Sequence, residues 1–167
     1  MLKSFVPNLL VHAVHNIPLD ELRARDIRGL LFDLDNTLLA HYGDEFTAEV
    51  VAWLQQVRDQ GFQVCIVSNG SPHRTLLLAE KLGVPGVPRS GKPRRRGLRR
   101  ALEQLGLTPS QAAMVGDQIF TDVWAGNRLG LYTILVAPIE PREPWFIRLK
   151  RLLEVVVLRL AGVRERG

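Results

Sequence analysis

Two pairs of aspartates in this 167-residue sequence each follow a run of apolar residues, an unusual place for unpaired charge. Asp33 and Asp35 come after one run, and Asp117 and Asp122 after another. Carboxylates that meet at the ends of buried strands repel one another and are costly to desolvate. Hard oxygen ligands of this kind suit Mg²⁺. A bound divalent ion would in turn let a phosphate anion approach a carboxylate.

Two further polar residues are predicted to lie at the same edge. Ser68 follows the apolar run 64–67, and Lys92 lies just beyond a weaker run at 84–87. A hydroxyl with nearby backbone N–H groups can hold phosphoryl oxygens, and a lysine adds a positive point charge. Taken singly, Ser68 also fits a local turn and Lys92 a surface lysine. In the second acidic motif, Thr121 is suggested to cap the next helix. Together they indicate a phosphoryl-transfer site.

The elements that would position these residues alternate between apolar runs and helical patterns. The predicted strands are 29–32, 63–67, 84–87, 112–115 and 131–136. The predicted helices are 47–59 with Thr47 as its cap, 71–82, 98–105 and 121–129. Apolar strands that alternate with helices require a parallel sheet covered on both faces. We therefore expect a doubly wound, Rossmann-like α/β domain over 28–138, with ligands beyond the carboxyl ends of its strands.

The ordered set of motifs resembles the four motifs of the haloacid dehalogenase (HAD) superfamily. These motifs are Asp33-Leu-Asp-Asn-Thr37, Ser68, Gly91-Lys92-Pro93 and Gly116-Asp117-x-x-x-x-Asp122. The resemblance implies that Asp33 is the nucleophile that forms an aspartyl-phosphate and that Asp35 is the general acid and base. It implies that Ser68 and Lys92 bind the phosphoryl group. The implied Mg²⁺ ligands are Asp33, the backbone carbonyl of Asp35, and Asp117, with Asp122 supporting the metal shell.

The resemblance narrows to the YqeG-type branch of HAD subfamily IIIA. The segment 15–29, the form Asp-Leu-Asp-Asn-Thr-Leu and the region 94–105 carry it. Relatives of this branch include the mitochondrial-type phosphatidylglycerophosphatases, which implies a phosphorylated substrate such as a lipid phosphate. The remaining predicted substrate-binding residues are Thr37, Asn69, Arg94 and Arg95.

Charge is concentrated in one segment of the chain. The formal net charge is +5, and seven Lys and Arg residues lie within 89–100, which contains no acidic residue. Such a run attracts a phosphate-rich partner, whether nucleic acid, anionic lipid or a small phosphorylated substrate. A solvated helix face is the alternative. Cys65, the single cysteine, lies in an apolar strand and is predicted to be buried, which favours a reducing, cytoplasmic location.

The spacing leaves no room for a cap domain, because only 27 residues separate Asp35 from Gln63. An uncapped site suits a bulky substrate, a membrane surface or completion by a second subunit of a homo-oligomer. We expect neither a signal peptide nor a membrane-spanning helix. The predicted organisation is a lead segment at 1–27 that packs on the core, the catalytic domain at 28–138, and a basic amphipathic helix at 139–167.

The carboxyl-terminal helix, predicted over 144–161, would gather its apolar residues on one face. These residues are Trp145, Phe146, Leu149, Leu152, Leu153, Val156, Val157 and Leu160. Such a face suits peripheral association with an anionic membrane, or packing on its own domain or a partner chain.

The sequence thus predicts a Mg²⁺-dependent phosphomonoesterase that acts through an aspartyl-phosphate, on a lipid phosphate such as phosphatidylglycerophosphate. One alternative is a phosphatase of a soluble phosphorylated metabolite or a nucleic-acid end. The other is a non-catalytic HAD-like module that binds RNA or protein through its arginines, which the intact acidic residues disfavour.

Overall fold

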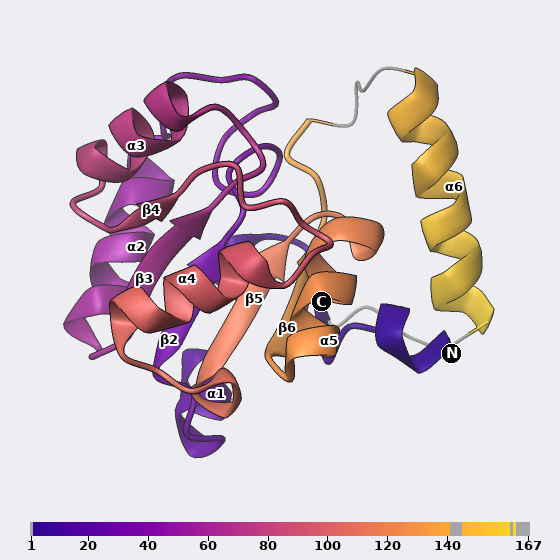
Figure 1. Ribbon diagram of the computed structural model, residues 1–167, viewed down its shortest axis with the longest axis horizontal. Coiled ribbons are helices and arrows are strands. Elements are labelled where there is room, and N and C mark those ends of the chain that lie inside the picture. Colours follow the sequence, from indigo (N-terminus) through magenta and orange to yellow (C-terminus); the bar gives the residue numbers. More distant parts are fainter. Residues whose placement is uncertain (1, 141–144, 161, 163–167) are drawn as a thin grey trace.

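A computed structural model describes residues 2–140, 145–160 and 162, and describes side chains in the last helix only from residue 152. Six parallel strands form one sheet in the order β1-β6-β5-β2-β3-β4 (Figure 1). The strands are β1 (Leu9–Val11), β2 (Gly29–Phe32), β3 (Gln63–Val67), β4 (Gly86–Val87), β5 (Ala112–Gly116) and β6 (Tyr132–Val136). The helices are α1 (Leu19–Ala24), α2 (Ala48–Asp59), α3 (Pro72–Lys81), α4 (Arg96–Leu105), α5 (Trp124–Leu129) and α6 (Trp145–Leu160).

Both faces of the sheet are covered, as a parallel sheet with apolar strands requires. Successive side chains of a strand point to opposite faces, so Phe32 packs with α1, α2 and α3 while Leu31 packs with α4 and α5. Cys65 is fully buried on the second face, as predicted, and burial raises the pKa of its thiol to about 12. The predicted doubly wound fold is confirmed, and no sizeable cap interrupts it within residues 2–140.

Most of the predicted elements match the structure closely. The strands at 29–32 and 63–67 have the predicted bounds, and Thr47 caps α2 by accepting a hydrogen bond from the Val50 N–H at 3.3 Å. Helix α4 ends as predicted at Gly106, whose φ of 65° is the left-handed conformation that favours glycine.

The helix predicted over 121–129 needs correction. The segment Ile119–Val123 is a π-helical turn, and α5 begins only at Trp124. Thr121 therefore lies inside the turn and does not cap it. The π turn folds the Asp122 side chain back toward the residues that precede it. There, the Asp122 carboxylate accepts a hydrogen bond from the Gln118 N–H at 3.2 Å.

The lead segment contributes a strand that the sequence analysis did not predict. Strand β1 pairs in parallel with β6, with Leu9 opposite Ile134. Asn8 anchors it, since its side chain accepts hydrogen bonds from the N–H and the hydroxyl of Thr133 at 2.8 and 3.0 Å. The sheet therefore begins at residue 9, outside the 28–138 range proposed for the domain.

Helix α6 lies beside the sheet (Figure 1). One of its polar residues, Glu154, is directed inward. Glu154 is 5% exposed, and its carboxylate accepts a hydrogen bond from the Ile119 N–H at 2.9 Å. The described apolar side chains that face solvent are Leu152, Leu153, Val155, Val156 and Leu160. The side chains of Trp145, Phe146 and Leu149 lie outside the described residues. Among the described helices, none has the length and apolar content needed to span a bilayer.

Candidate active site

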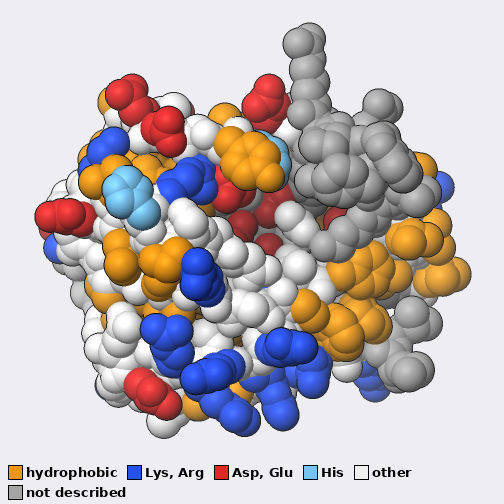
Figure 2. All heavy atoms as spheres, turned by 45° about the horizontal axis from the view of Figure 1, so that its top comes forward, with side chains coloured by type: hydrophobic (Ala, Val, Ile, Leu, Met, Phe, Trp, Pro, Cys, Tyr) orange, Lys and Arg blue, Asp and Glu red, His pale blue; other side chains and the backbone are white. Residues whose placement is uncertain are grey.

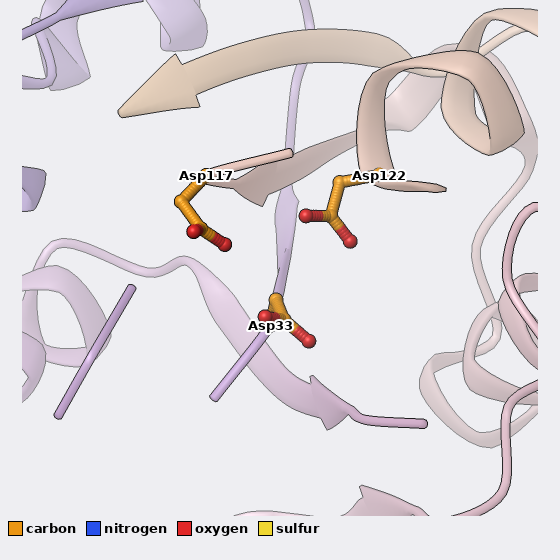
Figure 3. Close-up of side chains that lie close together, drawn as sticks. All are labelled: Asp33, Asp117 and Asp122. Carbon is orange, nitrogen blue, oxygen red and sulfur yellow. The ribbon is translucent and has the colours of Figure 1, made fainter. Parts of the chain in front are cut away.

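Two neighbouring strands bring the predicted carboxylates together. Strands β2 and β5 pair in parallel with Phe32 opposite Val115, so Asp33 and Asp117 leave the sheet at the same edge. The Asp33 N–H continues the ladder by donating to the Val115 carbonyl at 2.9 Å. Asp33, Asp117 and Asp122 each offer a carboxylate oxygen within 4.8 Å of the others (Figure 3). The predicted convergence of Asp33 and Asp117 is therefore present, but the Asp35 carboxylate, which was expected to join them, does not belong to the group.

Gly116 makes room for the third carboxylate. A Cβ atom built on Gly116 would overlap the carboxylate of Asp122. Only glycine at this position lets the π turn fold Asp122 back against the end of β5. The close approach of a side chain to the backbone thus explains why a glycine precedes Asp117.

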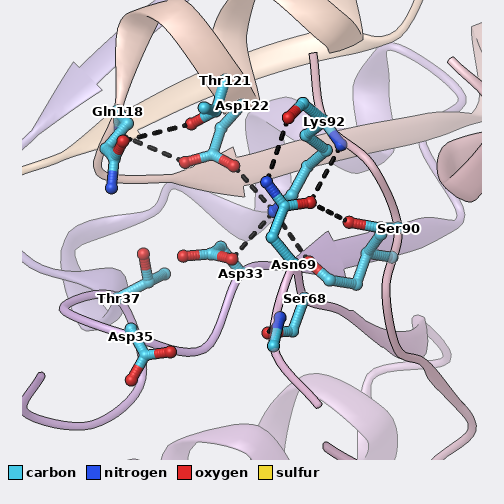
Figure 4. Close-up of polar contacts among 12 residues, drawn as sticks. Asp33, Asp35, Thr37, Ser68, Asn69, Ser90, Lys92, Gln118, Thr121 and Asp122 are labelled. Carbon is cyan, nitrogen blue, oxygen red and sulfur yellow. Dashed lines mark hydrogen bonds and ion pairs between the residues drawn. The ribbon is translucent and has the colours of Figure 1, made fainter. Parts of the chain in front are cut away.

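Lys92 links the acidic residues from the opposite side. Its ammonium donates to Asp33 at 2.8 Å and to the Val67 carbonyl at 2.7 Å, and it lies 2.7 Å from the Asp122 carboxylate (Figure 4). The Lys92 side chain is 1% exposed. The ammonium therefore has two hydrogen-bond acceptors and a second carboxylate in ion-pair contact, and Lys92 positions the two carboxylates in addition to supplying charge.

Burial and charge shift the protonation equilibria of this cluster. Burial raises the pKa of Asp33 to about 7, and the neighbouring Asp122 and Asp35 act in the same direction, while Lys92 opposes them. Burial alone would lower the pKa of Lys92, but Asp122 and Asp33 together raise it above its ordinary value. The ammonium is therefore charged throughout the physiological range, whereas Asp33 takes up a proton near neutrality.

The donor set of the cluster fits a divalent metal ion. Three carboxylates against one ammonium leave two negative charges in excess when all are ionised. Buried excess charge is costly, and a divalent cation would balance it. Carboxylate oxygens are the ligands that Mg²⁺ prefers, so the residues present suit that ion. A metal ion bound here would neutralise charge on an incoming phosphate.

The loop that carries Lys92 is held by the turn after β3. The Asn69 side chain accepts hydrogen bonds from the Ser90 hydroxyl at 2.7 Å and the Lys92 N–H at 2.9 Å, and donates to the Lys92 carbonyl at 3.0 Å. Ser68 is buried after β3, and its hydroxyl accepts from the Gly70 N–H at 3.0 Å. Asn69, predicted to bind substrate, is thus occupied in positioning Lys92.

Thr37 lies on the loop after β2, next to the cluster of Asp33, Asp117 and Asp122. Its hydroxyl donates to Asp117 at 3.4 Å, a long contact that orients the carboxylate. The same residue also lines a pocket of 370 Å³ between the ends of β1 and β6 and the start of α2. Most of the pocket lining is apolar, including Leu38, Trp53 and Ile139. Thr37 therefore joins the acidic cluster to a space that could hold an organic group.

Asp35, the predicted general acid, is turned away from the cluster. Arg74 on α3 donates to both of its carboxylate oxygens, at 2.9 and 3.1 Å, and the Tyr42 N–H donates to one of them at 3.0 Å. Figure 4 places the Asp35 side chain apart from the group around Lys92. The sequence analysis missed Arg74, although a basic residue in the first turn of the helix after Ser68 was a signal for it.

The two arginines predicted to bind substrate lie on the surface. Arg94 and Arg95 are exposed, and Arg95 donates to the Arg128 carbonyl at 3.2 Å, on the last turn of α5. Figure 2 shows acidic side chains within a hollow on this face of the molecule and Lys and Arg side chains gathered to one side of it. A role for these arginines in substrate binding stays a prediction.

Comparison with known proteins decides the family. The model of the haloacid dehalogenase-like hydrolase family matches residues 41–130, and that of mitochondrial PGP phosphatases matches residues 2–79. The protein named "Probable phosphatase YqeG" from Bacillus subtilis is 33% identical over 165 residues, which cover 99% of this chain and 95% of that protein. The chain belongs to the haloacid dehalogenase-like hydrolases. The predictions of this family and of phosphatase activity are confirmed.

One further relative and one solved structure are also similar to this chain. A phosphatidylglycerophosphate phosphatase of Arabidopsis thaliana is 27% identical over 94% of this chain, which spans 48% of that protein. The cobalt-bound deoxy-D-mannose-octulosonate 8-phosphate phosphatase of Haemophilus influenzae aligns with a TM-score of 0.55 at 16% identity, covering 83% of this chain and 91% of that one. This last likeness concerns the fold alone.

Proposed function

We propose that this hydrolase is a Mg²⁺-dependent phosphomonoesterase that works through an aspartyl-phosphate on Asp33, and that its substrate is a lipid phosphate such as phosphatidylglycerophosphate. The observation that carries the chemistry is the cluster of Asp33, Asp117 and Asp122 around one buried ammonium. This cluster supports the proposal because Asp33, as the nucleophile, would lie beside the carboxylate oxygens that a divalent ion needs.

In the first step, an Asp33 carboxylate oxygen attacks phosphorus while the bond from phosphorus to the leaving oxygen breaks. Asp35 gives its proton to that oxygen, so the product alcohol leaves neutral. In the second step, Asp35 takes a proton from water, and the resulting hydroxide attacks phosphorus. The bond to Asp33 breaks, inorganic phosphate is released and both carboxyl groups return to their starting states. Lys92 holds Asp33 in place through their 2.8 Å contact.

Three observations support a lipid substrate held at an anionic surface. The relatives include proteins named for phosphatidylglycerophosphate hydrolysis. Exposed arginines gather at the start of α4, where they could contact anionic headgroups. Leu152, Leu153 and Val156 are 51–64% exposed on α6, as expected of a helix that lies in a membrane interface. We accordingly propose a cytoplasmic protein that associates peripherally with membranes.

The chemistry is tested by hydrolysis of an aryl phosphate with and without a chelator. Wild type should turn over the substrate only with Mg²⁺, and Asp33→Asn should abolish turnover. Hydrolysis that survives chelation or this substitution would contradict the mechanism. The lipid part is tested separately, by comparing phosphatidylglycerophosphate in vesicles with soluble phosphomonoesters. A preference for the soluble compounds would favour the metabolite phosphatase instead.

Membrane association is tested by co-sedimentation with vesicles that contain or lack anionic lipid. We expect the wild type to pellet with anionic vesicles, and the triple change of Leu152, Leu153 and Val156 to glutamine to weaken pelleting at least tenfold. The matched control changes the exposed Leu76 and Leu77 of α3 to glutamine. Equal pelleting of both variants would overturn the role of α6.

A further inference from the structure

The Asp35–Arg74 pair poses a problem for the reaction in the proposed function. Both Asp35 oxygens accept hydrogen bonds from the Arg74 guanidinium, and one also accepts from the Tyr42 N–H. Both oxygens of a carboxyl group held in this way face the guanidinium, away from the place of a leaving group beside Asp33. Asp35 must therefore be released from Arg74 before it can act.

Arg74 is built to hold an anion at this place. Its guanidinium also donates to the Gly43 carbonyl at 2.7 Å, which fixes the position of the group. The Arg74 side chain is 21% exposed and that of Asp35 is 23% exposed, so solvent and ligand can reach the pair. Arginine presents a planar fork that suits carboxylates and phosphates equally. A substrate anion could thus replace the Asp35 carboxylate on the same donors.

One further donor of the Arg74 guanidinium has no hydrogen bond within the described residues. The Nε atom is buried without a hydrogen-bond acceptor, and the Asp44 carboxylate lies 3.9 Å from it. The guanidinium therefore keeps an unused N–H for another anionic acceptor.

We propose that Arg74 forms a subsite for a second anionic group of the substrate, and that binding of this group releases Asp35 for acid catalysis. The inference rests on the proposed function and adds a substrate class, phosphomonoesters that carry a second fixed anion. The exchange is inexpensive because the guanidinium gains one anion as it gives up another. A simple phosphomonoester leaves Arg74 on Asp35 and is turned over slowly.

The second anion could be a carboxylate or a phosphodiester, and two matched substrate pairs distinguish them. The first pair is 3-phosphoglycerate and glycerol 3-phosphate, which differ by a carboxylate. The second is a short-chain phosphatidylglycerophosphate and its analogue in which the diester is methylated to a neutral triester. Wild type should show a kcat/KM at least tenfold higher for the member that carries the second anion, in one pair or in both. No preference in either pair would overturn the proposal.

Substitution of Arg74 provides the second test. We expect Arg74→Gln to lower kcat/KM at least tenfold on the preferred substrate with two anionic groups and to raise kcat on its partner without the second anion, because Asp35 is no longer held. A merely structural role would lower both rates together, and that result would overturn the subsite. Arg74→Lys keeps the charge and should retain part of the preference. Arg58→Gln, which removes an arginine that donates to the Leu82 carbonyl, is the matched control.

The aryl phosphate assay separates failure of this proposal from failure of the proposed function. If wild type hydrolyses an aryl phosphate with Mg²⁺ but shows no preference for a second anion, only the subsite is wrong. If the aryl phosphate is not hydrolysed at all, the proposed function itself fails.

Discussion

Replacement of Asp33 by asparagine should stabilise the chain relative to wild type, and the difference in unfolding free energy should grow as the pH rises. The pKa of Asp33 is raised from 3.8 to about 7 by burial, so the fold favours the neutral form. The stabilisation from this preference is complete below the unfolded pKa and is lost as the pH rises through 7. Asparagine is uncharged at every pH and escapes this loss.

The size of the effect follows from the shift. A change of roughly three units corresponds to about 4 kcal/mol in the limit, at about 1.4 kcal/mol for each unit. Between pH 5 and pH 8, the same equilibria give about 2.5 kcal/mol. The stability of Asp33→Asn relative to wild type should therefore increase by that amount over this interval when no divalent ion is present.

Urea unfolding in the presence of a chelator measures this difference at pH 5 and pH 8. Asp44→Asn, the same change at a side chain that is 86% exposed, should run parallel to wild type. Added Mg²⁺ should stabilise wild type more at pH 8 than at pH 5, because its ligands bind as carboxylates. A stability difference between Asp33→Asn and wild type that stays constant from pH 5 to pH 8 would refute the assigned shift.

Three other changes test the packing of the site. Lys92→Met leaves Asp33 and Asp122 buried together without their ammonium, and should cost about 3–5 kcal/mol in urea unfolding, part of which Mg²⁺ restores. Gly116→Ala places a methyl group against the Asp122 carboxylate, and should lower aryl phosphate hydrolysis roughly 100-fold while circular dichroism shows a folded chain. Glu154→Ala leaves the Ile119 N–H without that acceptor, and should cost about 1–3 kcal/mol and speed hydrogen exchange in α6.

Each of these three predictions has a result that would contradict it. Lys81→Met, at an exposed lysine, is the control for Lys92, and equal stability losses would show that the buried ammonium has no special role. Undiminished hydrolysis by Gly116→Ala would mean that Asp122 need not approach the end of β5. Unchanged exchange in α6 after the Glu154 substitution would mean that other contacts hold the helix.

The sequence by itself determined the parallel sheet and the edge at which the site lies. Runs such as 64–67 are apolar throughout, which only a sheet buried on both faces satisfies, and the carboxyl ends of parallel strands share one edge. The convergence of Asp33 and Asp117 followed from that rule. The start of α2 could also be predicted from the local sequence, because a threonine cap acts on N–H groups within its own helical turn.

Tertiary structure alone decided the features that depend on long-range partners. Strand β1 is three residues long and gains its place through pairing with β6, more than a hundred residues away. The same holds for three other features. They are the π turn that carries Asp122, the contact of Glu154 with the Ile119 N–H, and the hydrogen bonds from Arg74 to Asp35. Contacts of this kind are set by which surfaces meet after folding, and spacing along the chain does not encode them.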